Sequence, residues 1–135
     1  MNRFWLDSNL LIRYLTGEPA GQASQVEKFM EQAERGEVRL ALDRLIVAEV
    51  IWALTSSIYH FSMSDIARDF VPFLSSDHLD VENRELLIDA IELSRDKNVD
   101  FIDSYLSLRA LQGGDQVCTF DKTDFKKLPA PWRTP

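Results

Sequence analysis

The chain has 135 residues, of which 45% are hydrophobic, and its 22 acidic and 15 basic residues give a net charge of -7. This length and apolar content fit a single globular domain over residues 1–135. One cysteine, Cys118, excludes a disulfide framework and a cysteine-based zinc site, as is typical of the reducing cytoplasm. The start lacks the regions of a signal peptide and no apolar run reaches membrane-spanning length, so we expect a cytoplasmic protein without a membrane partner.

The net negative charge argues against non-specific binding to a polyanion. The charge is nevertheless uneven, because residues 121–135 carry four basic side chains and only two acidic ones. A local basic rim beside acidic residues fits this pattern. A basic protein partner bound to an acidic pocket fits it equally well.

Apolar spacing and turn residues divide the chain into alternating strands and helices. The sequence first predicts a strand over 3–6, a helix over 9–15, and a helix with apolar positions 26, 29, 30 and 33 that ends at Gly36. It then predicts a strand over 38–42, a helix from Asp43 to about 57, a helix from Ser62 to about 72–76, and a strand over 79–81. The last predicted elements are a helix over 83–97, a helix from Asp100 to Gly113, and a strand over 116–120. The end, PAPWRTP, is predicted to be extended or to form a last short edge element.

Strands separated by helices favour parallel pairing with right-handed crossovers. The predicted fold is therefore a three-layer α/β/α sandwich with a central, mainly parallel sheet. Functional sites of such sheets lie at the carboxyl ends of the strands, and Asp7 and Asp121 follow two predicted strands directly.

Four acidic segments stand where an apolar stretch meets a predicted turn or helix: Asp7 in FWLDSN, Glu49 in LIVAEVIWAL, Asp103 in VDFIDSYL and Asp121 in VCTFDKTDF. Glu49 is predicted to be buried, because residues 45–54 are otherwise apolar, and a buried carboxylate requires compensation by a metal or by a buried arginine. The same burial argument applies to Asp103.

Capping gives several of these acids a purely structural alternative. Asp7 and Asp100 both stand where a helix N-cap is expected. A turn explains either Asp121 or Asp124, and we favour Asp121 as a site residue because the strand end directs it toward the crevice.

Carboxylates that converge without a cation repel one another, and a metal ion resolves that conflict. Ligands that are all oxygen suit Mg²⁺ or Mn²⁺. Such an ion lowers the pKa of bound water and stabilises charge on a phosphodiester, which predicts hydrolysis of a phosphate ester.

Rival motifs are absent or weak. The sequence has no Gly-rich phosphate loop, GxSxG elbow, HExxH or GxGxxG fingerprint, and His60 and His78 fall in predicted turns with nothing to pair them. The remaining candidates for chemistry or base stacking are predicted to pack in the core: Cys118, Trp5, Trp52, Phe70 and Phe73.

The acidic segments together resemble the PIN-domain ribonucleases, most closely the VapC toxins of toxin–antitoxin pairs. DSNLLIRYLTGEP is similar to the opening pattern of that family, AEVIWAL to its second block, DFIDSYLSLRA to its third and TFDKTDFKKLP to its last. The resemblance implies the following metal-site residues: Asp7, Glu49, Asp103 and Asp121 as metal-binding acids, Asp100 and Asp124 as helpers, and Ser8 near the metal water network.

The resemblance also implies an Mg²⁺- or Mn²⁺-dependent endoribonuclease that cuts tRNA or rRNA, forms a homodimer, and is inhibited by a cognate antitoxin in its active-site groove. Ser8 stands where the family more often has threonine, which keeps the hydroxyl. Tyr105 is bulkier than the usual residue of the third block, which predicts an altered groove and substrate choice.

Two other classes are compatible with a similar architecture. A catalytically inactive PIN-like protein-interaction module would keep the fold, although intact acids in all four segments count against it. A phosphate-accepting receiver domain would need paired acids after the first strand and a lysine after the last. Asp7 is followed by Ser8 and Asn9, so the first requirement fails.

Overall fold

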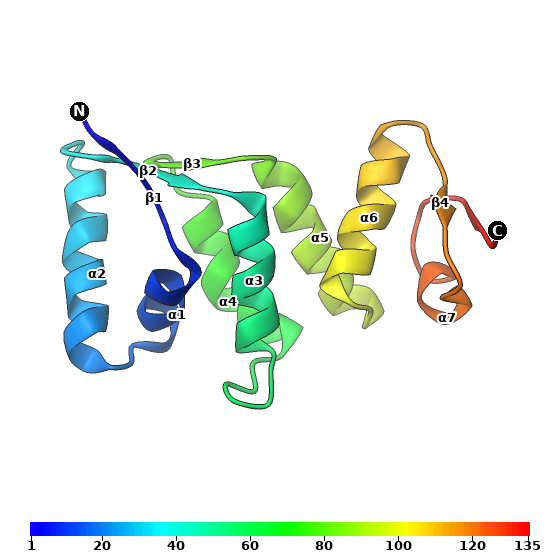
Figure 1. The fold of residues 1–135 in the computed structure, drawn as a ribbon, viewed down its shortest axis with the longest axis horizontal. Helices are drawn as coiled ribbons and strands as arrows, with labels where there is room; N and C mark the ends of the chain where they lie inside the picture. Colours follow the sequence, from blue (N-terminus) through cyan, green and yellow to red (C-terminus); the bar gives the residue numbers. More distant parts are fainter. The chain divides into compact units, whose positions relative to one another are not determined.

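The computed structural model describes all residues, Met1–Pro135, and divides them into two compact units. Unit 1 comprises Met1–Arg84 and unit 2 comprises Glu85–Pro135. Strands and helices alternate through most of the chain (Figure 1).

Unit 1 is built on a three-stranded parallel sheet in the order β1-β2-β3. Phe4 of β1 pairs with Leu40 of β2, which pairs in turn with Leu79 of β3. The elements of unit 1 are β1 (Arg3–Trp5), α1 (Ser8–Thr16), α2 (Ala20–Glu34), β2 (Arg39–Leu42), α3 (Arg44–Leu54), α4 (Met63–Leu74) and β3 (Leu79–Val81). Parallel strands joined by helices confirm the predicted α/β class.

Short polar side chains cap α3 and α4 of unit 1 where the sequence predicts it. The carboxylate of Asp43 accepts a hydrogen bond from the Leu45 N–H at 2.7 Å and caps α3. Ser62 and Asp65 exchange hydrogen bonds in a capping box at the start of α4. Each cap satisfies a backbone N–H that has no partner within the helix.

The core of unit 1 lies between β2 and the apolar faces of its helices. Each fully buried Val, Leu, Ile or Phe side chain contributes about 1.5–3 kcal/mol relative to exposure. The completely buried side chains include Leu11 of α1, Leu40 and Leu42 of β2, Val47 and Leu54 of α3, and Ile66, Phe70 and Leu74 of α4. Burial of residues on both α1 and α3 fixes these helices, and with them Asp7 at the N-cap of α1 and Glu49 within α3.

Unit 2 contains a two-stranded parallel sheet in which Val117 pairs with Trp132. Its elements are α5 (Arg84–Lys97), which begins at the last residue of unit 1, α6 (Phe101–Gln112), β4 (Val117–Cys118), α7 (Lys122–Phe125) and β5 (Trp132–Arg133). β5 confirms the predicted short edge element near the C-terminus. The single turn of α7 occupies a segment for which the sequence predicts only a turn.

A small apolar cluster holds unit 2 together. Val99, Val117, Phe125, Leu128 and Ala130 are buried in this cluster. Residues from β4, α7 and the C-terminal segment thus share one core, which fixes the position of α7.

Two buried serines on α6 provide a matched test of this packing. Ser104 and Ser107 are both fully buried, but only the Ser107 hydroxyl has a partner, the Ala130 N–H at 3.0 Å. We expect Ser107→Ala to lower the free energy of unfolding by about 1–3 kcal/mol, since it strands a buried N–H. Ser104→Ala is expected to leave it unchanged or raise it. Urea unfolding of both variants measures the difference, and equal losses would contradict it.

Several side chains predicted to lie in the core do not. Phe70 is fully buried as predicted, and Phe73 is half-buried, but Trp5 is 60% exposed and Trp52 is 76% exposed. Cys118 is also exposed. Successive strand residues point to opposite faces, so the buried Val117 directs Cys118 outward. No helix has the length and apolar character needed to cross a membrane.

Candidate metal centre

Asp7, Ser8 and Glu49 meet within unit 1. Asp7 ends the β1–α1 junction and caps α1, accepting the Asn9 N–H at 2.9 Å. The buried Ser8 hydroxyl donates to the Glu49 carboxylate and lies 3.3 Å from Oδ1 of Asp7. One hydroxyl therefore joins two carboxylates that are 42 residues apart in the chain.

Glu49 is exposed, so the prediction that it is buried is wrong. The buried face of α3 is formed by Val47, Val50, Ile51 and Leu54, and Glu49 lies on the opposite side. Its helical neighbours there, Leu45 and Trp52, are 73% and 76% exposed. The apolar surroundings in sequence therefore do not imply a desolvated carboxylate, because both faces of this helix are apolar.

Three carboxylates form a cluster in unit 2. One oxygen from each of Asp103, Asp121 and Asp124 lies within 4.8 Å of the other two. Asp103 and Asp124 are half-buried, whereas Asp121 is exposed. We call these three residues the aspartate cluster.

Local backbone chemistry positions the aspartate cluster. Asp121 caps α7 and accepts the Asp124 N–H at 3.0 Å, while its own N–H donates to Thr119 Oγ1 at 2.9 Å. Asp100 caps α6 by accepting the Ile102 N–H at 2.8 Å. The capping roles expected for Asp7 and Asp100 are thus confirmed, whereas Asp121 caps a short helix where the sequence predicts only a turn. The caps place each carboxylate at a helix N-terminus, where negative charge is stabilised.

The pKa of Asp103, in the aspartate cluster, is raised above its ordinary value. Burial, together with a hydrogen bond to Asp124 and the negative charges of Asp100, Asp124 and Asp121, raises its pKa from 3.8 to about 6. A carboxyl group whose ionisation is disfavoured by burial and by neighbouring carboxylates gains from a nearby cation.

The aspartate cluster fits a hard divalent cation. Its donors are all carboxylate oxygens, which suit Mg²⁺ and Mn²⁺ better than zinc or copper. Burial and the neighbouring carboxylates both raise the pKa of Asp103, and a bound cation would oppose that shift. Asp124, expected only as a helper, belongs to the cluster, whereas Asp100 contributes charge without being a member.

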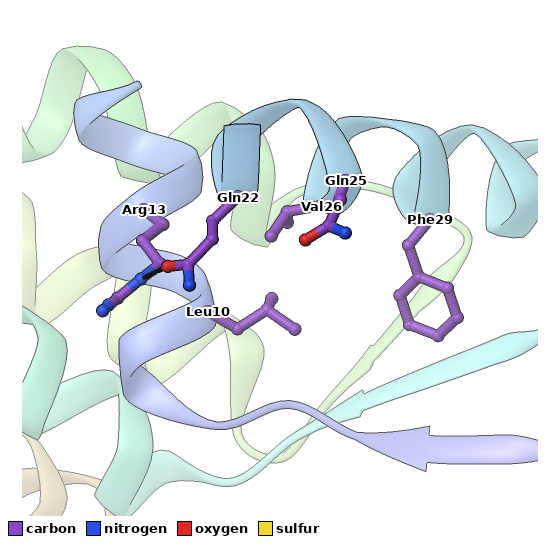
Figure 2. Close-up of a pocket in the computed structure, with 6 residues that line it drawn as sticks. All are labelled: Leu10, Arg13, Gln22, Gln25, Val26 and Phe29. Carbon is purple, nitrogen blue, oxygen red and sulfur yellow. Dashed lines mark hydrogen bonds between the residues drawn. The ribbon is translucent and has the colours of Figure 1, made fainter. Parts of the chain in front are cut away.

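A pocket elsewhere in unit 1 has different chemistry. Figure 2 shows this groove of about 420 Å³ between α1 and α2. Its lining consists of Leu10, Arg13, Gln22, Gln25, Val26 and Phe29, with Arg13 donating a hydrogen bond to Gln22. It has no carboxylate, histidine or cysteine, so it does not provide the ligand set of the aspartate cluster.

Asp7 and Glu49 belong to unit 1, whereas Asp103 and Asp121 belong to unit 2. The structure brings the predicted acids together within each unit. Their joint action on a single metal ion stays a prediction.

Phe120 is an exposed residue that the sequence reasoning missed. Its side chain is 83% exposed and directly precedes Asp121. The alternation that directs Cys118 outward from the buried Val117 also predicts an outward Phe120 two residues later. This signal depends on the burial of Val117, which the structure supplies.

The fold agrees with a comparison to known families. Residues 4–131 match the PIN domain, and the chain therefore belongs to the PIN-domain family. It is also similar to a protein named VapC ribonuclease from Aquifex aeolicus (strain VF5). The two are 26% identical over 124 residues, which cover 91% of this chain and 90% of that protein.

The raised pKa of Asp103 predicts how stability depends on pH without metal. Between about pH 4 and 6 the folded chain holds a proton on Asp103 that the unfolded chain has lost, so this contribution to stability declines as pH rises. In EDTA, Asp103→Asn should therefore be more stable relative to wild type at pH 7 than at pH 4.5. Urea unfolding at both values measures the difference, and a pH-independent difference would contradict it.

Proposed function

We propose that this PIN-domain protein is a metal-dependent endoribonuclease that hydrolyses RNA phosphodiester bonds as the toxin of a toxin–antitoxin pair. The observation that carries the proposal is the aspartate cluster, in which Asp103 has a pKa raised to about 6. Membership of the PIN-domain family and similarity to a protein named VapC ribonuclease support it.

We further propose that Asp7, Glu49, Asp103 and Asp121 hold Mg²⁺ or Mn²⁺, with support from Asp100 and Asp124. A bound ion would lower the pKa of a water molecule and stabilise negative charge on the phosphodiester. The contacts among the protein's own residues support these roles.

Within unit 1, the Ser8 hydroxyl holds the side chains of Asp7 and Glu49 at one point. Within unit 2, the caps of α6 and α7 orient Asp103, Asp121 and Asp124 before any ligand arrives. Rigid placement of this kind reduces the reorganisation that binding and reaction require.

The proposed biological setting is the cytoplasm, with tRNA or rRNA as the substrate, a homodimer as the assembly and a cognate antitoxin as the inhibitor. Clustered carboxylates attract a basic side chain as well as a metal ion. An antitoxin that presents lysine or arginine to these acids would therefore compete with metal and substrate.

A catalytically inactive interaction module is the second candidate. The observation that favours it is the exposed apolar face of α3, where Leu45 and Trp52 lie on either side of Glu49. Large exposed apolar side chains on one helix face are typical of protein contacts.

Incubation of the purified protein, free of antitoxin, with total RNA and with isolated tRNA separates the two candidates. Reactions contain Mg²⁺, Mn²⁺ or EDTA, and Asp7→Asn is tested in parallel. Discrete fragments that require metal and disappear in the variant are the expected result for a site-specific endoribonuclease. Fragments formed equally by Asp7→Asn would overturn its assignment, and no cleavage with either metal would favour the interaction module.

A further inference from the structure

A group of exposed basic and aromatic residues in unit 2 lies next to Asp121 and Asp124 in the sequence. It consists of Phe120, Lys122, Lys126 and Lys127, and we call it the Phe120–lysine strip. We propose that this strip binds single-stranded RNA, with Phe120 stacking on a base and the lysines contacting backbone phosphates. The inference rests on the proposed function and specifies how the substrate would be held beside the metal-binding acids.

Phe120 is suited to stacking because it is both exposed and fixed. Its ring is 83% exposed, which is costly for a large apolar side chain in water. The Lys122 N–H donates to the Phe120 carbonyl at 3.1 Å, and the Asp121 N–H donates to Thr119 Oγ1 at 2.9 Å. An aromatic side chain on a fixed backbone loses little conformational entropy when a base stacks on it, and stacking accepts any base.

The lysines of the strip carry charge that other side chains do not neutralise. Three of the five lysines of the chain lie within residues 122–127, and all three are exposed. None of them takes part in an ion pair with a carboxylate, in contrast to several arginines. Those paired arginines are Arg3, Arg35, Arg39, Arg44, Arg68 and Arg95.

This placement reconciles the acidic chain with a polyanionic substrate. The protein as a whole has a net charge of -7 and repels RNA, but the uncompensated cations lie within six residues of Asp121. Phe125, which is 2% exposed, anchors α7 in the core of unit 2 and holds the surrounding lysines in place. Phosphates bound there would lie next to a carboxylate that we assign to the metal.

The strip is tested by RNA binding, measured separately from cleavage. A short fluorescent single-stranded RNA of mixed sequence is titrated with full-length protein in Mg²⁺, in an Asp7→Asn background that keeps the RNA intact. We expect Phe120→Ala to weaken RNA binding about tenfold, because it removes the stacking of one base. Phe120→Trp should retain the affinity for RNA, because tryptophan also stacks on a base. Replacing the three lysines by glutamine should lower the slope of log affinity against log salt by about 2.

Matched controls lie outside the strip. Ile58→Ala removes an equally exposed apolar side chain, and Lys28→Gln with Lys97→Gln removes the other two lysines of the chain. These control variants, made in the same Asp7→Asn background, should bind the RNA with the affinity of the Asp7→Asn protein.

The possible results distinguish a failure of the RNA-binding inference from a failure of the proposed function. RNA binding that is unchanged in both strip variants would overturn the inference even if the wild type cleaves RNA, and would indicate an acidic protein partner for these lysines. Binding that falls only in the strip variants would support it, whatever the wild-type cleavage assay shows. Equal losses in the strip and control variants would overturn it.

Discussion

Asp121→Asn is expected to lower the rate of RNA cleavage by about a hundredfold or more. A metal ion contributes several kcal/mol of charge stabilisation in the transition state, and each 1.36 kcal/mol changes the rate tenfold. Asparagine keeps an oxygen that can accept the Asp124 N–H and so preserves the cap of α7. The fold should therefore persist while the charge is lost. Cleavage rates at saturating Mg²⁺, together with urea unfolding, measure the two effects separately.

Asp115→Asn is the matched control for this prediction. Asp115 is an exposed aspartate of unit 2 that lies outside the aspartate cluster. Its replacement changes the net charge by the same amount, so a general charge effect on RNA binding would appear in both variants. Equal rates for Asp121→Asn and wild type would remove Asp121 from the metal site.

The second large effect is expected from single substitutions in either unit, and their combination tests whether the two acids act together. Asp7→Asn and Asp103→Asn should each lower cleavage by about a hundredfold if both carboxylates serve the same ion. The double variant should then be about as slow as either single variant, because residues that act as a unit have strongly non-additive effects. Single-turnover cleavage rates of the four proteins complete the cycle.

A multiplicative result would contradict joint action. Rates in the double variant that fall by the product of the two single losses would assign Asp7 and Asp103 to independent roles. Mg²⁺ titration by calorimetry provides the control that does not depend on activity. Each single variant should weaken the same binding event if the prediction holds.

The N-termini of several helices are predictable from the local sequence. Asp43, Ser62 and Asp100 cap helices where the sequence predicts them, because a capping side chain bonds to a backbone N–H two or three residues away. The strands at 79–81 and 116–120 are also found, although the second is shorter, as Val117–Cys118. Parallel pairing follows from the alternation of strands and helices. The single-turn helix α7 was missed because four residues carry no periodicity.

Burial proved the weakest basis for prediction. Glu49 was expected to be buried because its sequence neighbours are apolar, but a helix has two faces, and Leu45 and Trp52 lie on the exposed one. Trp5 and Cys118 were placed in the core for the same reason. Residue type indicates only a preference for burial. The packing of neighbouring elements decides which face of a helix or strand is covered.

The sequence by itself determined the element order, most of the helix caps and the family resemblance, and it singled out the candidate acids, because each depends on residue type and short spacing. Only the tertiary structure decided that Ser8 joins Asp7 to Glu49, and that Asp124 completes a cluster with Asp103 and Asp121. It also decided that the pKa of Asp103 is raised to about 6. These properties depend on burial and on distances between side chains far apart in the chain, and both arise only when the chain packs.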